Sequence, residues 1–242
     1  MTGPSASNSD LILAKENVHH LTYFPFHGLA GCIRTTLVLS GEPYENHILS
    51  FREWMTQKPL TPFGHIPILR EETKCGKSFE IAEISAIEFF LAKRAGNLLG
   101  KDFWEESQIR MFHSSTHALI TFLVHTIVQS PQSDRAAFLA RFKKTNLPQW
   151  VKSHEKYLVA NGSNGHYVGD QLSIADIKTA SVIEHLINLT SGEGETPLIS
   201  EDLTPAIMAV KNNLEKNPQY AEWKASQQYQ EFTGGNLGFF GF

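Results

Sequence analysis

The spacing of apolar residues changes near residue 100, and this change most constrains what the chain can fold into. Before it, short β-type runs alternate with helical runs, whereas after it every apolar run has the spacing of an amphipathic helix. The glycine-containing segment 96–102 between the two parts predicts a linker. The sequence therefore predicts a domain at 18–96 and a second one at 103–242, preceded by a flexible polar tail at 1–17.

The first part predicts a small α/β domain. Its expected strands are 20–23, 46–49, 66–69 and 79–81, and its expected helices are 29–40 and 83–95. These elements follow one another as βαβ and then ββα. That is the order of a thioredoxin-like domain, in which helices pack on the faces of a mixed sheet.

The second part predicts an all-α domain. Its expected helices are 104–129, 134–143, 149–159, 174–188, 204–216 and 220–229. Prolines separate these helices, at positions 131, 148, 197, 205 and 218. Ser173 followed by Asp176 predicts a capping box, an acidic variant, at the start of the helix that begins at residue 174.

Composition excludes several functional classes. The formal net charge is −4 and the chain has no run of Lys or Arg, so we expect no nucleic-acid partner. No apolar run reaches about 18 residues, so we expect no membrane span. The first ten residues lack the pattern of a secretory signal, so the cytoplasm is the expected location. In that compartment Cys32 and Cys75 are expected to be reduced.

Tyr23 is the first candidate for chemistry. It ends the first predicted strand and stands just before the start of a helix. A phenol at that position can donate a hydrogen bond to a thiolate, and the helix dipole favours negative charge at the same place. The alternative is a tyrosine whose ring simply packs in the core at the end of the sheet.

A second group of candidates surrounds Pro67. The bond between Ile66 and Pro67 opens a strand shortly after a glycine, where a cis peptide is tolerated. A cis bond would turn the backbone groups of Ile66 toward a peptide ligand, which can then pair as an extra strand. Trp54 and Lys58 could supply a wall and a cation for a carboxylate. The alternative is a proline that only marks the edge of a sheet.

Glu83 begins the next predicted helix, where free backbone amides can hold an anion. An ordinary amphipathic helix with an acidic first turn explains this residue equally well.

Taken in order, these motifs resemble the cytosolic glutathione transferases, and among them most closely the Sigma class. The resemblance covers roughly residues 18–235. The residues that carry it are Leu21, Thr22, Tyr23, Phe24, Trp54, Lys58, the segment 62–69, Ala86, Ile87, Leu91, Ala92, and the segments 169–170 and 173–176.

The resemblance implies a function. It implies a glutathione transferase fold and a transferase of the kind used in detoxification, with glutathione as co-substrate. Its thiolate would attack a small hydrophobic electrophile, in conjugation or isomerisation. It also implies a homodimer that pairs the first domain of one subunit with the helical domain of the other.

The resemblance also implies a role for each candidate. Tyr23 would hydrogen-bond the glutathione sulfur, Trp54 and Lys58 would contact the glycine end, and Ile66 would pair with the cysteinyl backbone. The implied glutathione site consists of Tyr23, Trp54, Lys58, Gly64, His65, Ile66, Pro67, Glu83 and Ile84.

The sequence departs from the family pattern at two places. Glu83 stands at the Gln or Glu of the pair that holds the γ-glutamyl group, but Ile84 replaces the serine of that pair. In the arginine-rich stretch after the tyrosine, His27 and Leu29 take the two arginine positions and Gly31 replaces a glutamate. These departures leave a second possibility open, a non-catalytic binding, scaffold or crystallin-like protein of the same fold.

Two further features are open at this stage. His113 and His117 lie one helical turn apart, a spacing that can bind metal, but no third ligand is near in sequence. We therefore expect a half-exposed helix face and no metal site. The Gly- and Phe-rich segment 234–242 is either a frayed end, a cover over the apolar pocket, or part of a subunit contact.

Overall fold

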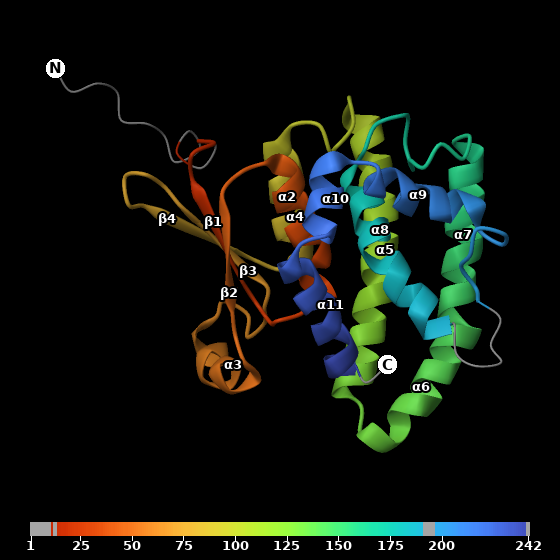
Figure 1. The fold of residues 1–242 in the computed structure, drawn as a ribbon, viewed down its shortest axis with the longest axis horizontal. Coiled ribbons are helices and arrows are strands. Elements are labelled where there is room, and N and C mark those ends of the chain that lie inside the picture. Colours follow the sequence, from red (N-terminus) through yellow and green to blue (C-terminus); the bar gives the residue numbers. More distant parts are fainter. Residues whose placement is uncertain (1–10, 12–13, 191–196, 241–242) are drawn as a thin grey trace.

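The computed structural model describes residues 11, 14–190 and 197–240, and consists of a small sheet on one side and helices on the other (Figure 1). The strands are β1 (Val18–Tyr23), β2 (Tyr44–Ile48), β3 (Ile68–Glu72) and β4 (Ser78–Ala82). Their order across the sheet is β2-β1-β3-β4. β1 pairs parallel with β2 and antiparallel with β3, and β3 pairs antiparallel with β4. The predicted mixed sheet is therefore confirmed.

One face of this sheet packs against two helices, α2 (Gly31–Ser40) and α4 (Ile84–Ala95). Burial alternates along β1, and its inward side chain Leu21 joins Ile33 and Ile87 in one core cluster. Each of these side chains is fully buried, which stabilises the fold by about 1.5–3 kcal/mol per residue. The other side chains of β1 point to the opposite face of the sheet, which α2 and α4 do not cover.

The rest of the described chain is mainly helical, as predicted. Its helices are α5 (Phe103–Gln129), α6 (Gln132–Lys144), α7 (Asn146–Ala160), α8 (Ile174–Thr190), α9 (Pro205–Glu215), α10 (Pro218–Lys224) and α11 (Gln227–Phe240). α5 and α8 pack together at its centre, and α8 also packs on α2, so the two parts of the chain share an interface. Of the described helices, none combines the length and hydrophobicity required to span a bilayer.

The predicted capping box at Ser173 is confirmed. The Asp176 carboxylate accepts from the Ser173 N–H at 2.8 Å, and Ser173 Oγ accepts from the Asp176 N–H at 3.4 Å. The same carboxylate accepts from the Tyr167 N–H at 2.9 Å. This cap therefore also fixes the loop that leads into α8.

Several element boundaries differ from the prediction. The sequence predicted no helix between 46–49 and 66–69, but α3 (Phe51–Gln57) and the short 3-10 helix η2 (Lys58–Leu60) lie there. α3 begins at a capping box, in which Ser50 Oγ accepts from the Glu53 N–H at 3.2 Å. A seven-residue helix shows little periodicity, so only its cap could have revealed it.

Two prolines and the C-terminal segment behave differently from the prediction. Pro148 was expected to separate two helices, yet it lies in the first turn of α7, where its missing N–H leaves no helical bond unmade. The helix expected at 220–229 is two helices, α10 and α11, and Pro218 begins the first of them. The Gly- and Phe-rich segment is no frayed end, because α11 continues through it to Phe240; residues 241–242 lie outside the described part.

A buried ionic group joins the two parts of the chain. The Glu88 carboxylate on α4 lies 2.7 Å from His113 Nε2 on α5 and 2.7 Å from Lys178 Nζ on α8. The side chains of all three are at most 3% exposed, so His113 does not lie on the half-exposed helix face that its sequence spacing suggested. Burial by itself would raise the pKa of Glu88, but Lys178 and His113 outweigh it and hold that pKa at about 2.

This group yields a stability prediction. Replacing Lys178 by Met keeps most of the side-chain volume but leaves the buried Glu88 carboxylate without its lysine. We expect Lys178→Met to lower the free energy of unfolding by about 3–5 kcal/mol, measured by urea denaturation. Lys152→Met, at an exposed position of α7, is the control and should change it by less than about 0.5 kcal/mol. Equal losses in both variants would contradict the importance of the ionic group.

Candidate active site

Tyr23 lies at the end of β1, with its ring in the core of the first part and only 4% of the residue exposed. Its hydroxyl oxygen accepts a hydrogen bond from the Leu29 N–H at 3.2 Å, at the turn where the 3-10 helix η1 (Gly28–Ala30) leads into α2. Burial raises the pKa of Tyr23 to about 12, although the Leu29 N–H and Arg34 act in the opposite direction. The phenol is therefore neutral at physiological pH and retains a proton to donate.

Gly28 allows this close approach of the turn to the phenol. Its φ is +41°, and a Cβ added there would lie 2.9 Å from the Tyr23 hydroxyl and 2.8 Å from the Phe26 ring. Any side chain at this position would therefore displace the hydroxyl or the ring. The glycine keeps the backbone amides of η1 next to the hydroxyl.

Arg34 holds the loop that follows Tyr23. It is fully buried and donates to the carbonyl oxygens of Phe24 at 3.1 Å and Phe26 at 2.6 Å, and to Asn46 Oδ1 at 3.0 Å. Loop backbone that would otherwise lack partners is thereby satisfied by one guanidinium group. The sequence did not point to this role of Arg34, because its partners are mostly carbonyl groups and leave no sequence signal.

The Ile66–Pro67 peptide bond is cis, the first of the two alternatives that the sequence left open. Pro67 is buried and Ile66 packs partly against the core of the first part. Just before them, Gly64 has a φ of +69°, and Lys58 Cε lies 3.7 Å from the position that a Cβ of Gly64 would occupy. Lys58 and the segment that contains Gly64 and His65 are therefore neighbours, and both Lys58 and His65 are exposed.

Trp54 projects from α3 into a cluster of aromatic rings. Its ring centroid lies 6.3 Å from that of Phe24, whose own ring lies 5.5 Å from Tyr23 and 4.6 Å from Phe51. Phe24 thus lies between Trp54, the predicted wall of the site, and Tyr23, the predicted catalytic residue. The sequence marked Phe24 only as part of a motif, because contacts between rings from different elements are not visible in one sequence.

Glu83 and Ile84 begin α4 at the other side of Pro67. Glu83 is exposed and has a φ of +71°, which is uncommon for a residue other than glycine and costs on the order of 1–3 kcal/mol. Ile84 is half-buried and offers no hydroxyl, so the amides at the start of α4 and the Ser85 side chain are the polar groups there.

The register of the sheet brings these residues to one end of it. Thr22 pairs with Ile68, and Ile68 pairs with Ala82. One position further, Tyr23, Pro67 and Glu83 follow one another across the end of three adjacent strands. Tyr23, Pro67 and Glu83 therefore lie at one end of the sheet, and Trp54 and Lys58 lie on the segment that continues from β2.

The C-terminal helix α11 covers the loop beside Tyr23. The carbonyl oxygen of Phe232 accepts from the His27 N–H at 3.4 Å, and its ring lies 3.9 Å below the Arg34 guanidinium carbon. A Cβ on Gly235 would lie 2.1 Å from the Pro25 carbonyl oxygen, so the helix can approach this closely only because a glycine stands there. Burial and the nearby Arg34 lower the pKa of His27 to about 4, so this residue supplies no positive charge in place of an arginine.

Comparison with known proteins identifies relatives of this chain. Residues 117–227 match the family model described as glutathione S-transferase, C-terminal domain. Glutathione S-transferase P of Caenorhabditis elegans is 32% identical over 157 residues, which cover 64% of this chain and 71% of that protein. The chain belongs to the glutathione S-transferase family.

Other relatives extend the match over most of the chain. Probable glutathione S-transferase 8 of C. elegans is 27% identical over 219 residues, or 89% of this chain and all of that protein. The structure of the Fasciola hepatica sigma class enzyme superposes with a TM-score of 0.73 at 25% identity and covers 88% of this chain and 99% of the other. The thioredoxin-like and helical architecture is therefore that of the transferase family, whose co-substrate is glutathione.

The departure at Ile84 can be tested by restoring the hydroxyl group. A serine there could donate one hydrogen bond to the γ-glutamyl carboxylate, worth about 1.5–3 kcal/mol when the acceptor is charged. We expect Ile84→Ser to tighten glutathione binding by about ten-fold or more, measured by titration calorimetry.

Ser85→Ala is the matched control for this change. If the amides of α4 alone hold the carboxylate, removal of the Ser85 hydroxyl should leave the affinity of the native protein unchanged. Native binding without any gain in Ile84→Ser would mean that the γ-glutamyl group is held elsewhere.

Proposed function

We propose that this glutathione transferase uses Tyr23 to hold the glutathione sulfur as a thiolate, which then attacks a small hydrophobic electrophile. The observation that supports this role is the position of the Tyr23 hydroxyl. It accepts from the Leu29 N–H at the start of the first helix, and in the described part of the chain no acceptor takes its own proton. That proton can therefore be donated to an anionic sulfur.

The energy required is within reach of these groups. A free thiol has a pKa of about 8.5, and lowering it by two units needs about 2.7 kcal/mol of differential stabilisation. A charge-assisted hydrogen bond from Tyr23 contributes about 1.5–3 kcal/mol. The helix N-terminus that begins at Gly28 adds about 0.3–1 kcal/mol.

The remaining site residues take the roles that the family resemblance implies. In this proposal Trp54 and Lys58 bind the glycine end of glutathione, and Ile66 pairs with its cysteinyl backbone beside Pro67. Glu83 and the amides at Ile84 hold the γ-glutamyl group. Gly64 and His65 complete the wall between Lys58 and Ile66.

We assign residues 18–96 to the glutathione-binding domain and 103–242 to the domain that lines the electrophile site. The similarity to a sigma class structure supports placement near that class. The resemblance to cytosolic transferases supports a cytoplasmic location. Relatives named as transferases along nearly the whole chain favour an enzyme over the crystallin-like alternative, in spite of Leu29 and Ile84.

Tyr23→Phe tests the mechanism directly, because it removes only the hydroxyl group. We expect turnover in a conjugation assay with a chlorinated nitroaromatic to fall by about ten- to a thousand-fold, the range for losing one donor to a developing charge. Tyr157→Phe, at a position 48% exposed on α7, should leave turnover unchanged. Unaltered turnover in Tyr23→Phe would remove this residue from the mechanism.

The homodimer is also a proposal, and exposed apolar side chains on both domains support it. In the first domain Leu60 and Phe63 are 83% and 64% exposed, and in the second Phe103 and Trp104 are 84% and 67% exposed. Apolar groups exposed to this degree are typical of surfaces that another subunit covers.

We expect light scattering to give twice the chain mass of 27.1 kDa at micromolar concentration. Phe63→Arg should shift the protein toward the monomer, because a charge would be buried in the interface. Val159→Arg, at an exposed position of α7, is the control and should stay dimeric. A native mass of one chain across the micromolar range would overturn the dimer.

A further inference from the structure

The face of the sheet that the core leaves uncovered carries a group of metal-binding side chains. Because side chains alternate along a strand, His20 of β1 points away from the core residues Leu21 and His19. The parallel register pairs His20 with Glu45 of β2, and His47 lies two residues further on the same face. Residues 25 or more positions apart are thereby brought together by strand pairing alone.

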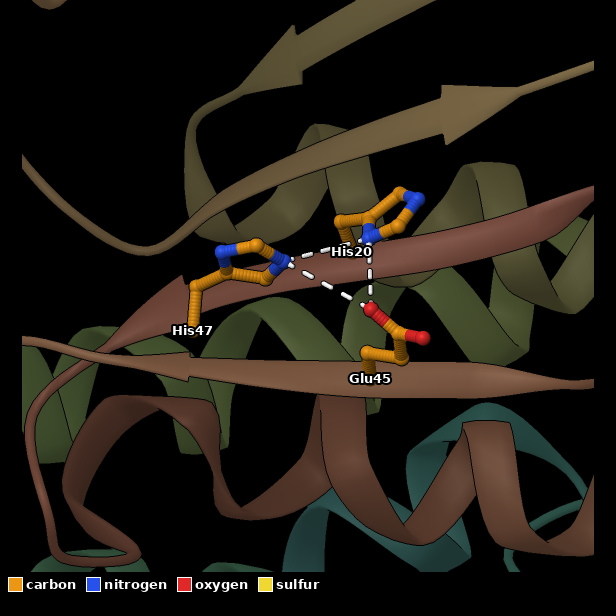
Figure 2. Close-up of side chains that lie close together, drawn as sticks. All are labelled: His20, Glu45 and His47. Atoms are coloured by element: carbon orange, nitrogen blue, oxygen red, sulfur yellow. Dashed lines mark hydrogen bonds and ion pairs between the residues drawn. The ribbon is translucent and has the colours of Figure 1, made fainter.

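Figure 2 shows the three side chains converging on one point. His20 Nδ1 lies 3.1 Å from His47 Nε2 and 3.2 Å from Glu45 Oε2, and the distance between His47 Nε2 and Glu45 Oε2 is 3.8 Å. For zinc at about 2.0–2.1 Å from each ligand atom, tetrahedral geometry separates the ligand atoms by about 3.3–3.4 Å. The observed separations bracket this value.

The neighbouring carboxylate of Glu72 prepares His20 to act as a ligand. Glu72 Oε2 lies 3.6 Å from His20 Nε2, whereas Glu45 lies near the other ring nitrogen, Nδ1. With its proton on Nε2, facing Glu72, the ring presents the Nδ1 lone pair to the other two ligand atoms. Carboxylates behind a histidine commonly set its tautomer in this way at metal sites. Arg70, which pairs with His20 across the sheet, is a cation beside this group, and its guanidinium lies 3.6 Å from the Glu72 carboxylate.

We propose that His20, Glu45 and His47 form a binding site for a divalent transition-metal ion, with Zn²⁺ as the best match. Two imidazoles and one carboxylate are the donor set that zinc accepts, and three protein ligands leave the fourth position for water. The sequence predicted no metal site because it offered only the His113 and His117 spacing. This site depends on strand pairing and does not rest on the proposed transferase mechanism.

The proposed site would join the edge strand β2 to its neighbour β1. β2 is an edge strand, and it leads directly into α3, which carries Trp54. A metal ion held by His20 and His47 would fasten β2 to β1 on the solvent side. The two histidines also line a groove of about 350 Å³ that extends to Gln57 at the end of α3 and to Leu60 of η2. Metal binding is thus expected to stabilise the strand that leads to the glutathione site.

Titration calorimetry of the untagged full chain with Zn²⁺ tests the proposal. We expect one ion per chain and, with Co²⁺ as a probe, the intense visible absorption of a tetrahedral site. His20→Ala and His47→Ala should each weaken binding by about a hundred-fold or more, and Glu72→Gln by about ten- to a hundred-fold. The melting temperature of the native protein should rise with Zn²⁺, whereas that of His47→Ala should not.

Two controls separate this site from other surface ligands. His125→Ala removes an exposed histidine of α5, and Cys75→Ala removes the exposed thiol, and neither should change the zinc affinity. Circular dichroism verifies that each variant is folded. Absence of zinc binding by the native protein, equal binding by His47→Ala, or loss of binding in either control would overturn the proposal.

Discussion

The ion group of Glu88, His113 and Lys178 is the contact on which the arrangement of the two parts depends. It joins α4, which covers the sheet, to α5 and α8, which form the centre of the helical part. Because the group is buried, the Glu88 carboxylate depends on His113 and Lys178 as its partners, and this favours a helix placement that brings the three side chains together. The apolar packing of α2 on α8 adds stability, but it is less specific about direction.

The candidate active site follows from the strand register within the first part. Tyr23, Pro67 and Glu83 lie side by side because three adjacent strands begin or end at the same end of the sheet, one face of which is covered by α2 and α4. Two unusual backbone positions lie there, the close approach at Gly28 and the positive φ of Glu83. Such conformations persist when the surrounding core determines them, and here that core is the cluster around Leu21 and Ile87.

The two faces of the sheet have separate chemistry. The inner face supplies the core and the tyrosine, whereas the outer face holds two histidines and their carboxylates next to an open groove. Side chains alternate between the two faces along β1, so Tyr23 and His20 point to opposite sides although they lie within four residues. Binding on the outer face can therefore be changed by mutation without altering the core that supports Tyr23.

The sequence by itself determined the fold class with its mixed sheet, through the order of the elements, and the cap at Ser173, through a motif of neighbouring residues. It allowed a cis bond before Pro67 but did not decide it. It also identified Tyr23, Trp54 and Glu83 as candidates, through the order of local motifs. Only the tertiary structure decided the burial of His113, the support of the loop by Arg34, the covering by α11 and the grouping of His20 with His47. These features depend on strand register and helix packing between distant residues, and local periodicity carries no information about either.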